Sequence, residues 1–211
     1  MKKVLLSVLV LTIISVACAQ SEKKEETSSK WVEGQHYEVV SEKASEEPKV
    51  TEFFSHYCGH CFQFERWIDT VKTAIKVPFE KSHVSYIPQN DSLVAMGMVK
   101  AFVIMQELDV EETVSPQMFA AIHLSNEGVQ TEEAIKEIFL LNDISSEQYD
   151  ELYASQEVYD KAKAMSELWL ERRITSVPTL VVNDKYKVNM GSVTSMDELI
   201  ELTIALTKIE D

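Results

Sequence analysis

Hydrophobic and polar positions along the chain predict strands at its start, helices through its middle and strands again near its end. Short apolar runs over 36–40, 49–54 and 79–87 predict three β-strands. After the second run, apolar residues recur at spacings of three and four, which predicts an amphipathic helix that ends before Pro78. The members of this apolar stripe are Cys61, Phe64, Ile68, Val71 and Ile75.

The middle of the chain carries helical signals and no convincing strand. The first helix has one apolar face, made of Val94, Met98, Ala101, Met105 and Leu108. Ser115 is placed to cap the next helix, with Pro116 at its first position. Thr131 and Ser145 predict two further capped helices. A fifth helix ends near Arg173, and its apolar face is made of Val158, Ala162, Met165 and Trp169.

Strand patterns return after the helices. Runs over 179–183 and 186–190 flank Asp184 and Lys185, which predicts a hairpin with a two-residue connection. A last helix, capped by Ser195, has an apolar stripe of Leu199, Leu202, Leu206 and Ile209. The order is therefore β-β-α-β, then helices, then β-β-α, and both outer parts must combine to bury one sheet.

Composition fits a soluble globular protein. The chain has 211 residues, of which 45% are hydrophobic and 26% are charged. These values exclude a disordered chain and a multi-span membrane protein, and the length predicts one or two domains.

The N-terminus predicts export. Residues 1–19 place two lysines before an uncharged run and end in Ala17-Cys18-Ala19, as a cleavable signal peptide does. The sequence "ISVAC" also resembles a bacterial lipoprotein signal, in which Cys18 is lipidated and 20–30 forms a flexible tether. Both interpretations stay open, and both place the protein in the periplasm.

Charge argues against two classes of partner. The net charge is −15, and it becomes −17 once Lys2 and Lys3 are removed with the signal. Such acidity repels nucleic acid and anionic membrane surfaces, so we expect neither as a partner.

Cys58 and Cys61 are the only cysteines that follow the signal. A structural zinc site needs four ligands, and the second pair is missing unless His56 and His60 converge from a strand end and a helix start. Haem attachment needs a histidine directly after the second cysteine, and position 62 is phenylalanine. We therefore expect neither a metal nor a haem here.

A redox centre fits the cysteines better. Cys58 precedes the helix that carries Cys61, so unpaired N–H groups and the helix dipole stabilise a thiolate there, and a protonated His60 adds to this. A stabilised thiolate makes the disulfide an oxidant of other thiols, and Cys61, one turn further on, suits the resolving step. An inert disulfide is the weaker interpretation, because so short a loop gains little entropic stabilisation.

Two motifs carry a resemblance to a known family. The stretches "VTEFFSHYCGHCFQFE" and "ITSVPTLVVNDKYKVN" resemble the two active-site segments of DsbA-type thiol:disulfide oxidoreductases. The resemblance covers 31–211 and implies an α/β fold, namely a thioredoxin fold with an inserted all-helical domain. It predicts a thioredoxin-like domain over 31–90 and 156–211, and the helical insertion over 91–155.

The resemblance also assigns roles. Cys58 becomes the exposed nucleophile, His60 its pKa-lowering neighbour and Cys61 the resolving thiol. Pro178 becomes a cis-proline that faces the disulfide, and Val177 supplies main-chain contacts to a bound peptide.

Glu52 and Gly59 complete the candidate set. The family has an acid at the position of Glu52, where a buried carboxyl with a raised pKa relays a proton to or from Cys61; a Glu at a sheet edge that points outward is the alternative. Gly59 belongs to the substrate-binding set, but the family usually has proline there. Protein disulfide isomerases also have Cys-Gly-His-Cys, so the direction of exchange stays open.

The sequence thus predicts an exported oxidoreductase that donates the Cys58–Cys61 disulfide to folding proteins with free thiols. The family implies reoxidation by a DsbB-type quinone-linked membrane partner, no bound cofactor and a monomer. One alternative is a reductase or isomerase held in the dithiol form, although known isomerases of this type carry an N-terminal dimerisation domain for which we expect no room. Another is a peptide-binding or chaperone module, whose function would survive replacement of Cys58.

Overall fold

A computed structural model of the chain describes residues 30–89 and 91–209. The predicted signal peptide, Cys18 and all of the predicted tether except Lys30 lie outside the described residues. Within those residues, no helix combines the length and the apolar character needed to cross a lipid bilayer.

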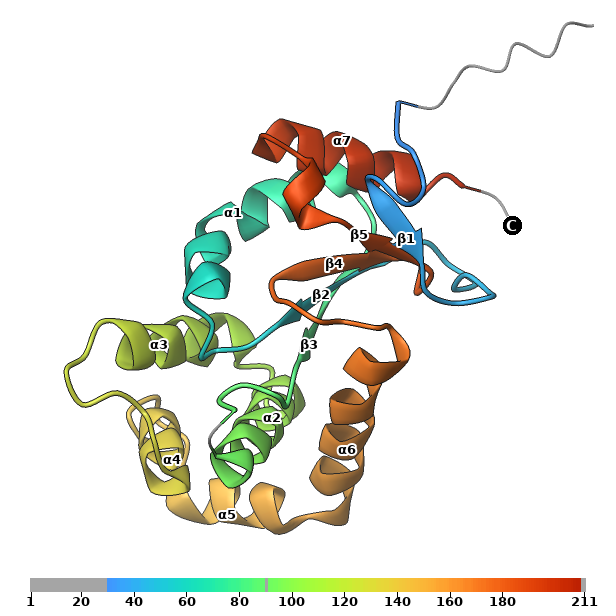
Figure 1. Cartoon of the computed structure of the whole chain (residues 1–211). Coiled ribbons are helices and arrows are strands. Elements are labelled where there is room, and N and C mark those ends of the chain that lie inside the picture. Colours follow the sequence, from blue (N-terminus) through green and yellow to red (C-terminus); the bar gives the residue numbers. More distant parts are fainter. Residues whose placement is uncertain (1–29, 90, 210–211) are drawn as a thin grey trace, which may run out of the picture. The chain divides into compact units, whose positions relative to one another are not determined.

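One five-stranded mixed sheet forms within the described residues, in the order β1-β5-β4-β2-β3 (Figure 1). The strands are β1 (Tyr37–Val39), β2 (Val50–Phe54), β3 (Phe79–His83), β4 (Thr179–Val182) and β5 (Tyr186–Val188). β2 pairs with β3 in parallel and with β4 antiparallel, so the N-terminal and C-terminal parts of the chain meet at the centre of the sheet. All residues of β2 and β4 are buried, as expected for strands covered on both faces.

Helices α1 (Gly59–Ile75) and α7 (Met196–Leu206) cover one face of this sheet (Figure 1). The predicted stripe of α1 is confirmed, because all five of its members are buried. Four of them, Phe64, Ile68, Val71 and Ile75, share a core with Leu199, Leu202 and Leu206 of α7 and with residues of β2, β4 and β5. Ile209 is an exception, since it lies beyond the end of α7 and is exposed.

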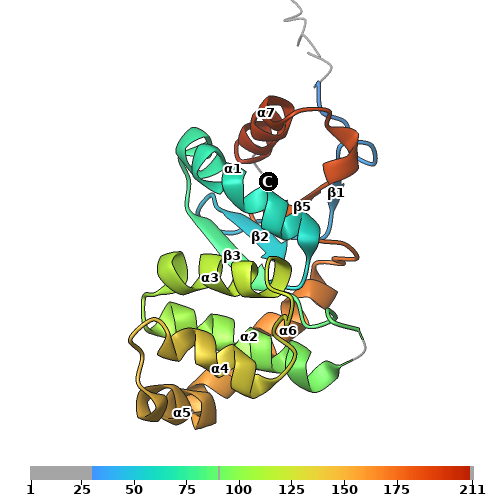
Figure 2. The same ribbon diagram turned by 90° about the vertical axis from the view of Figure 1, so that its left-hand side faces the viewer.

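Five helices stand between β3 and β4 and form a block on the other side of the sheet (Figure 2). They are α2 (Ser92–Glu107), α3 (Glu111–His123), α4 (Glu132–Leu140), α5 (Ser146–Ala154) and α6 (Gln156–Glu171). The predicted caps Thr131 and Ser145 are confirmed, because each side chain accepts an N–H from the first turn of its helix.

α2 is the centre of this block, and four residues of its predicted apolar face, Val94, Met98, Ala101 and Met105, are buried together with others. Each of the other four helices packs against it, so its buried residues occur around the whole helix. They are Val94, Ala95, Gly97, Met98, Val99, Ala101, Phe102, Val103, Ile104 and Met105. A helix that is apolar all round is one that its neighbours enclose.

The start of α3 also differs from the prediction. The helix begins at Glu111, and Val110 precedes it without a side-chain cap, so Ser115 and Pro116 lie inside it. Ser115 is buried and hydrogen-bonds to another side chain instead of capping. A Ser-Pro pair is also compatible with the first turns of a longer helix. Here one more helical turn, which starts at Glu111 and includes the buried Val114, precedes the pair.

Strands β3 and β4 both end earlier than predicted. β3 ends at His83 because Val84 makes the last main-chain bond to Phe54, after which the chain turns. In the β4–β5 hairpin, β4 ends at Val182, so the connection has three residues, 183–185, rather than the two predicted, and Asn183 and Asp184 have left-handed backbones.

The helical block joins the sheet where the predicted site lies. Phe54, at the end of β2, and Cys61, in the first turn of α1, belong to the same apolar core as α2 and α3. Cys61 is therefore enclosed where the two parts of the molecule meet.

Candidate active site

Cys58 is the N-cap of α1, in the turn that leaves β2. Its backbone is extended, with φ −93° and ψ 113°, and its sulfur accepts the backbone N–H of Cys61 at 3.3 Å. The sulfur thus takes the place that an oxygen usually takes in a helix cap. Cys58 is half-buried, whereas Cys61 is completely buried.

The two thiols have opposite acidities. A hydrogen bond from the Cys61 thiol, with backbone hydrogen bonds from Cys61 and His60 and the charge of His60, lowers the pKa of Cys58 to about 6 against partial burial. Burial, followed by the bond to Cys58 and its charge, raises the pKa of Cys61 far above the ordinary range. The pair can therefore hold one accessible thiolate beside one protonated, enclosed thiol.

His60 and Gly59 occupy the exposed side of the same turn. Gly59 is the first residue of α1, and a β-carbon built on it meets no atom within 4 Å. Nothing in the folded structure therefore requires glycine at this position.

The second predicted segment lies against the first. The Cys58 thiol donates to the carbonyl oxygen of Val177 at 3.4 Å, and the Val177–Pro178 peptide bond is cis, as the resemblance implied. Both residues are half-buried. They reach Cys58 because Thr179, at the start of β4, pairs with Phe53 near the end of β2.

Glu52 is completely buried at the centre of β2, so the alternative of an outward-pointing edge residue was wrong. Its carboxylate lies 3.6 Å from Lys81 Nζ, an ion pair too long for a hydrogen bond, while Lys81 also contacts Glu65 at 2.5 Å. Burial raises the pKa of Glu52 to about 8, although Lys81 opposes the shift. Its charge also contributes to the raised pKa of Cys61.

Lys81 was not predicted as a member of the site. It is the residue of β3 directly opposite Glu52 in the parallel pairing. The available signal was a pair of opposite charges on two strands that pair with each other. Using that signal requires the register of β2 and β3.

Three histidines meet around the turn, of which only His56 had been considered, as a zinc ligand. His56 and His83 are completely buried, with ring centroids 5.2 Å apart, and His123 contacts the backbone of His56. They come from the β2–α1 turn, from β3 and from α3, so no local motif links them. His56 Nε2 lies 2.9 Å from Ser115 Oγ, and in the described part of the chain no three His, Cys, Asp or Glu side chains gather to hold a metal ion.

Known proteins resemble this chain in sequence and in fold. Residues 49–201 match the family described as a DSBA-like thioredoxin domain. A relative from Yersinia pestis, named thiol:disulfide interchange protein DsbA, is 30% identical over 182 residues, which cover 83% of this chain and 86% of that protein.

Two solved structures establish the likeness in fold. DsbA from Klebsiella pneumoniae aligns with a TM-score of 0.73 at 24% identity, over 85% of this chain and 98% of that one. DsbA from Proteus mirabilis, solved with a non-covalently bound peptide PWATCDS, aligns with a TM-score of 0.73 at 22% identity, over 85% and 99%.

Proposed function

This chain belongs to the family of DSBA-like thioredoxin domains, and from that premise we propose that it is an exported dithiol oxidase that donates its Cys58–Cys61 disulfide to folding proteins. It is a protein-disulfide oxidoreductase, as its relatives are. The proposal concerns the direction of exchange, the substrates and the partner.

The opposite acidities of the two cysteines carry the proposal. A thiolate stabilised at Cys58 lowers the free energy of the reduced protein relative to the oxidised protein. The same stabilisation makes Cys58 a good leaving group when a substrate resolves the mixed disulfide. Both effects favour release of the disulfide to a substrate.

The reaction proceeds in two exchanges. A substrate thiolate attacks the sulfur of Cys58, the Cys58–Cys61 bond breaks, and Cys61 leaves as a thiolate that takes up a proton. A second substrate thiolate then attacks the substrate sulfur bound to Cys58, which leaves as a thiolate. The substrate loses two electrons and two protons overall. The protein gains both electrons and one proton, as the Cys58 thiolate and the Cys61 thiol, and the other proton goes to the solvent.

We assign the proton that Cys61 takes up to Glu52. With its pKa raised to about 8, the Glu52 carboxyl is mostly protonated at neutral pH and can act as an acid. Lys81 limits this shift and keeps the group near the pH at which it can also accept the proton back. Reoxidation of the dithiol needs that reverse transfer.

Substrate binding is assigned to the surface around Cys58. Gly59 and His60 are exposed on one side of the sulfur, and Val177 and Pro178 lie on the other. The Proteus mirabilis relative binds a cysteine-containing peptide, and an extended segment with one free thiol is the substrate that we propose here.

We further propose that the protein acts in the periplasm as a monomer and is reoxidised by a DsbB-type membrane partner that passes the two electrons to a quinone. Residues 1–19 would direct export, with cleavage after Ala19 or lipidation of Cys18. Intact-mass spectrometry of the exported protein separates these two outcomes. Reoxidation that requires both membranes and quinone, with quinone alone inactive, tests the partner.

Equilibration of the purified protein with glutathione redox buffers tests the direction. We expect a disulfide more oxidising than glutathione, together with transfer of that disulfide to a reduced, unfolded protein. The Cys58 thiolate of C61S should attack a cysteine peptide supplied as its mixed disulfide with glutathione and keep the peptide as a mixed disulfide while glutathione leaves, and C58S should form none. A thioredoxin-like reduction potential together with a near-neutral pKa of Cys58 would reject the oxidase in favour of a reductase or isomerase. If C58S binds unfolded proteins and protects them as well as the parent does, while neither transfers a disulfide, the protein is a peptide-binding module.

A further inference from the structure

The backbone of His56 is held on both sides by imidazole rings. His56 lies in a turn that is closed by a hydrogen bond from the Cys58 N–H to the Ser55 carbonyl at 3.0 Å. Its own N–H donates to Nε2 of His83 at 3.0 Å, and its carbonyl lies 2.8 Å from Nε2 of His123. Both main-chain groups of one turn residue are therefore bound by side chains from elsewhere in the fold.

The donors and acceptors in this arrangement are fixed by their partners. His83 Nδ1 lies 2.9 Å from the carbonyl of Val84, so it must donate, and Nε2 is left to accept from His56. Burial agrees with a neutral ring, since it lowers the pKa of His83 to about 3. On the other side, the His56 carbonyl can only accept, so Nε2 of His123 carries the hydrogen.

The His56 carbonyl belongs to the central peptide group of the turn. The orientation of this group is what distinguishes type I from type II turns, and type II needs a left-handed residue at the position of Tyr57. Tyr57 is not among the residues with positive φ. A donor that holds the carbonyl therefore also holds the turn in the form from which Cys58 enters α1.

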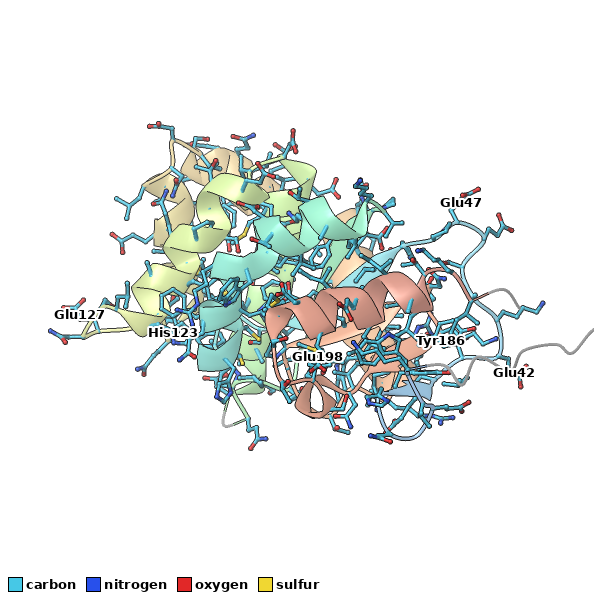
Figure 3. All side chains as sticks on the ribbon, turned by 90° about the horizontal axis from the view of Figure 1, so that it is seen from above. Glu42, Glu47, His123, Glu127, Tyr186 and Glu198 are labelled. Atoms are coloured by element: carbon cyan, nitrogen blue, oxygen red, sulfur yellow. The ribbon has the colours of Figure 1, made fainter. Side chains whose placement is uncertain are left out.

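His123 comes from the helical block and lies against the start of α1. It is the last residue of α3, and Figure 3 labels it at that end of the helix. Its ring stacks on Phe62 of α1, with centroids 5.0 Å apart and planes at 9°. The imidazole thus contacts the segments on both sides of Cys58, in the turn and in the helix.

Two further bonds join the same turn to the helical block. Ser115 of α3 lies 2.9 Å from Nε2 of His56, and the hydroxyl of Tyr57 donates to the carbonyl of Val129 at 2.9 Å. These bonds act on side chains, whereas His123 acts on the peptide group itself.

We propose that His123 is a positioning residue for the exchange reaction: the N–H that it donates from the helical block fixes the turn that presents Cys58. The inference rests on the proposed function, because it concerns the same disulfide. Without that N–H, the carbonyl of the central peptide loses its partner, and only the Tyr57 N–H of that peptide stays bonded, to Ser55 Oγ at 3.1 Å. The turn then fixes the Cys58 sulfur less firmly at its position 3.3 Å from the Cys61 N–H. The reduced form therefore loses more stability than the oxidised form, because in the oxidised form the disulfide bond itself fixes the Cys58 sulfur.

Three substitutions separate the hydrogen bond from the packing. H123F keeps a ring on Phe62 and removes the donor, while H123Q removes the ring and places an amide N–H at the position of Nε2. H123N places its amide at the position of Nδ1, out of reach of the carbonyl, and serves if H123F does not fold. Each protein is equilibrated with glutathione, and unfolding by urea is measured for its oxidised and reduced forms.

We expect the equilibrium constant for disulfide donation to fall about threefold to tenfold in H123F and H123N, the factor that one net hydrogen bond is worth. The thiolate absorbance of Cys58 should titrate at higher pH in both, and H123Q should stay close to the parent protein. Equal destabilisation of both redox forms with an unchanged constant would show that His123 only supports the fold, and would overturn the proposal. Failure of the parent protein itself to oxidise glutathione or a substrate would reject the proposed function instead.

Discussion

The backbone N–H of Cys61 donates to the sulfur of Cys58 at 3.3 Å, so the residue proposed to leave in the first exchange also stabilises the Cys58 sulfur. The contact follows from their spacing. When Cys58 is the N-cap of α1, Cys61 is the third residue of the helix, and an N-cap side chain accepts an N–H from the second or third residue. Two intervening residues therefore place one sulfur at the cap and the other inside the first turn.

The first prediction concerns the pH dependence of this pair. The thiolate absorbance of the reduced protein should titrate with a midpoint near pH 6, because the cap contacts lower the pKa of Cys58 to about 6. C58S should lose this transition, since Cys61 stays protonated throughout the same range. Absorbance spectroscopy on both reduced proteins measures the effect, and a midpoint near 9 in the parent would contradict the assignment.

The stability of the reduced protein should depend on the same ionisation of Cys58. The folded pKa of Cys58 is lowered from 9.0 to about 6, so its contribution to stability is complete above pH 9 and is lost as the pH falls through 6. The free energy of unfolding of the reduced protein, relative to reduced C58S, should therefore rise from pH 6 to pH 9. Burial, the largest cause of the raised pKa of both Glu52 and Cys61, is present in both proteins, so these two groups contribute little to the difference. If the difference in unfolding free energy between the two reduced proteins does not change from pH 6 to pH 9, the prediction is wrong.

Local signals predicted the parts of this site that lie close together in the sequence. The apolar stripe of α1 placed Cys58 at the helix start, and the sequence alone indicated its acidity. The contacts of Lys81 and His123 depend on the register of β2 with β3 and on the docking of α3, which no local pattern encodes. The start of α3 was missed for a related reason, because packing rather than a capping side chain sets its first turn.

The second prediction is that E52Q slows disulfide donation. The substitution keeps the shape of the side chain and removes the acid that we propose as the proton donor to Cys61. The rate constant at pH 7 should fall about tenfold or more, as is typical for loss of a positioned acid. Because the pKa of Glu52 is about 8, the ratio of parent to E52Q rates should approach one above that pH. Stopped-flow measurements of disulfide transfer across this pH range provide the test.

E52Q should also change stability in a definite direction. A carboxyl whose folded pKa is raised contributes stability below its ordinary pKa of 4.5 and loses it as the pH rises through about 8. The stability of E52Q relative to the parent should therefore increase between these values. E80Q is the matched control, because Glu80 is an exposed carboxylate on the adjacent strand. If E80Q reproduces either effect, the site-specific explanation is wrong.

The third prediction concerns the hydrogen bond between Ser115 and His56. S115A leaves the buried His56 ring with no partner on Nε2, and its Nδ1 already has none in the structure. An unpartnered buried polar group costs about 1–3 kcal/mol, so unfolding in urea should show a loss of that size.

A double-mutant cycle isolates this hydrogen bond from other effects of the substitution. H56F removes the ring nitrogens but leaves the backbone groups that bind His83 and His123. In the H56F background, S115A should cost much less, because no acceptor or donor is left behind. Equal costs in both backgrounds would show that Ser115 contributes through packing alone.

The last prediction is that proline fits at position 59. Gly59 is the first residue of α1, where proline is well tolerated, and Cys58 before it has the extended backbone, φ −93° and ψ 113°, that a residue before proline prefers. A β-carbon meets nothing within 4 Å there. G59P should therefore raise the free energy of unfolding by about 0.4–1 kcal/mol, by restricting the unfolded chain.

G59P should leave the acidity of Cys58 unchanged. The backbone hydrogen bonds that lower the pKa of Cys58 come from Cys61 and His60, so loss of the Gly59 N–H removes none of them. G59A is the matched control, because it restricts the unfolded chain and keeps the N–H. A Cys58 midpoint that rises in G59P but not in G59A would show that the Gly59 N–H also stabilises the thiolate. Destabilisation by both variants would mean that the turn needs a backbone conformation only glycine adopts.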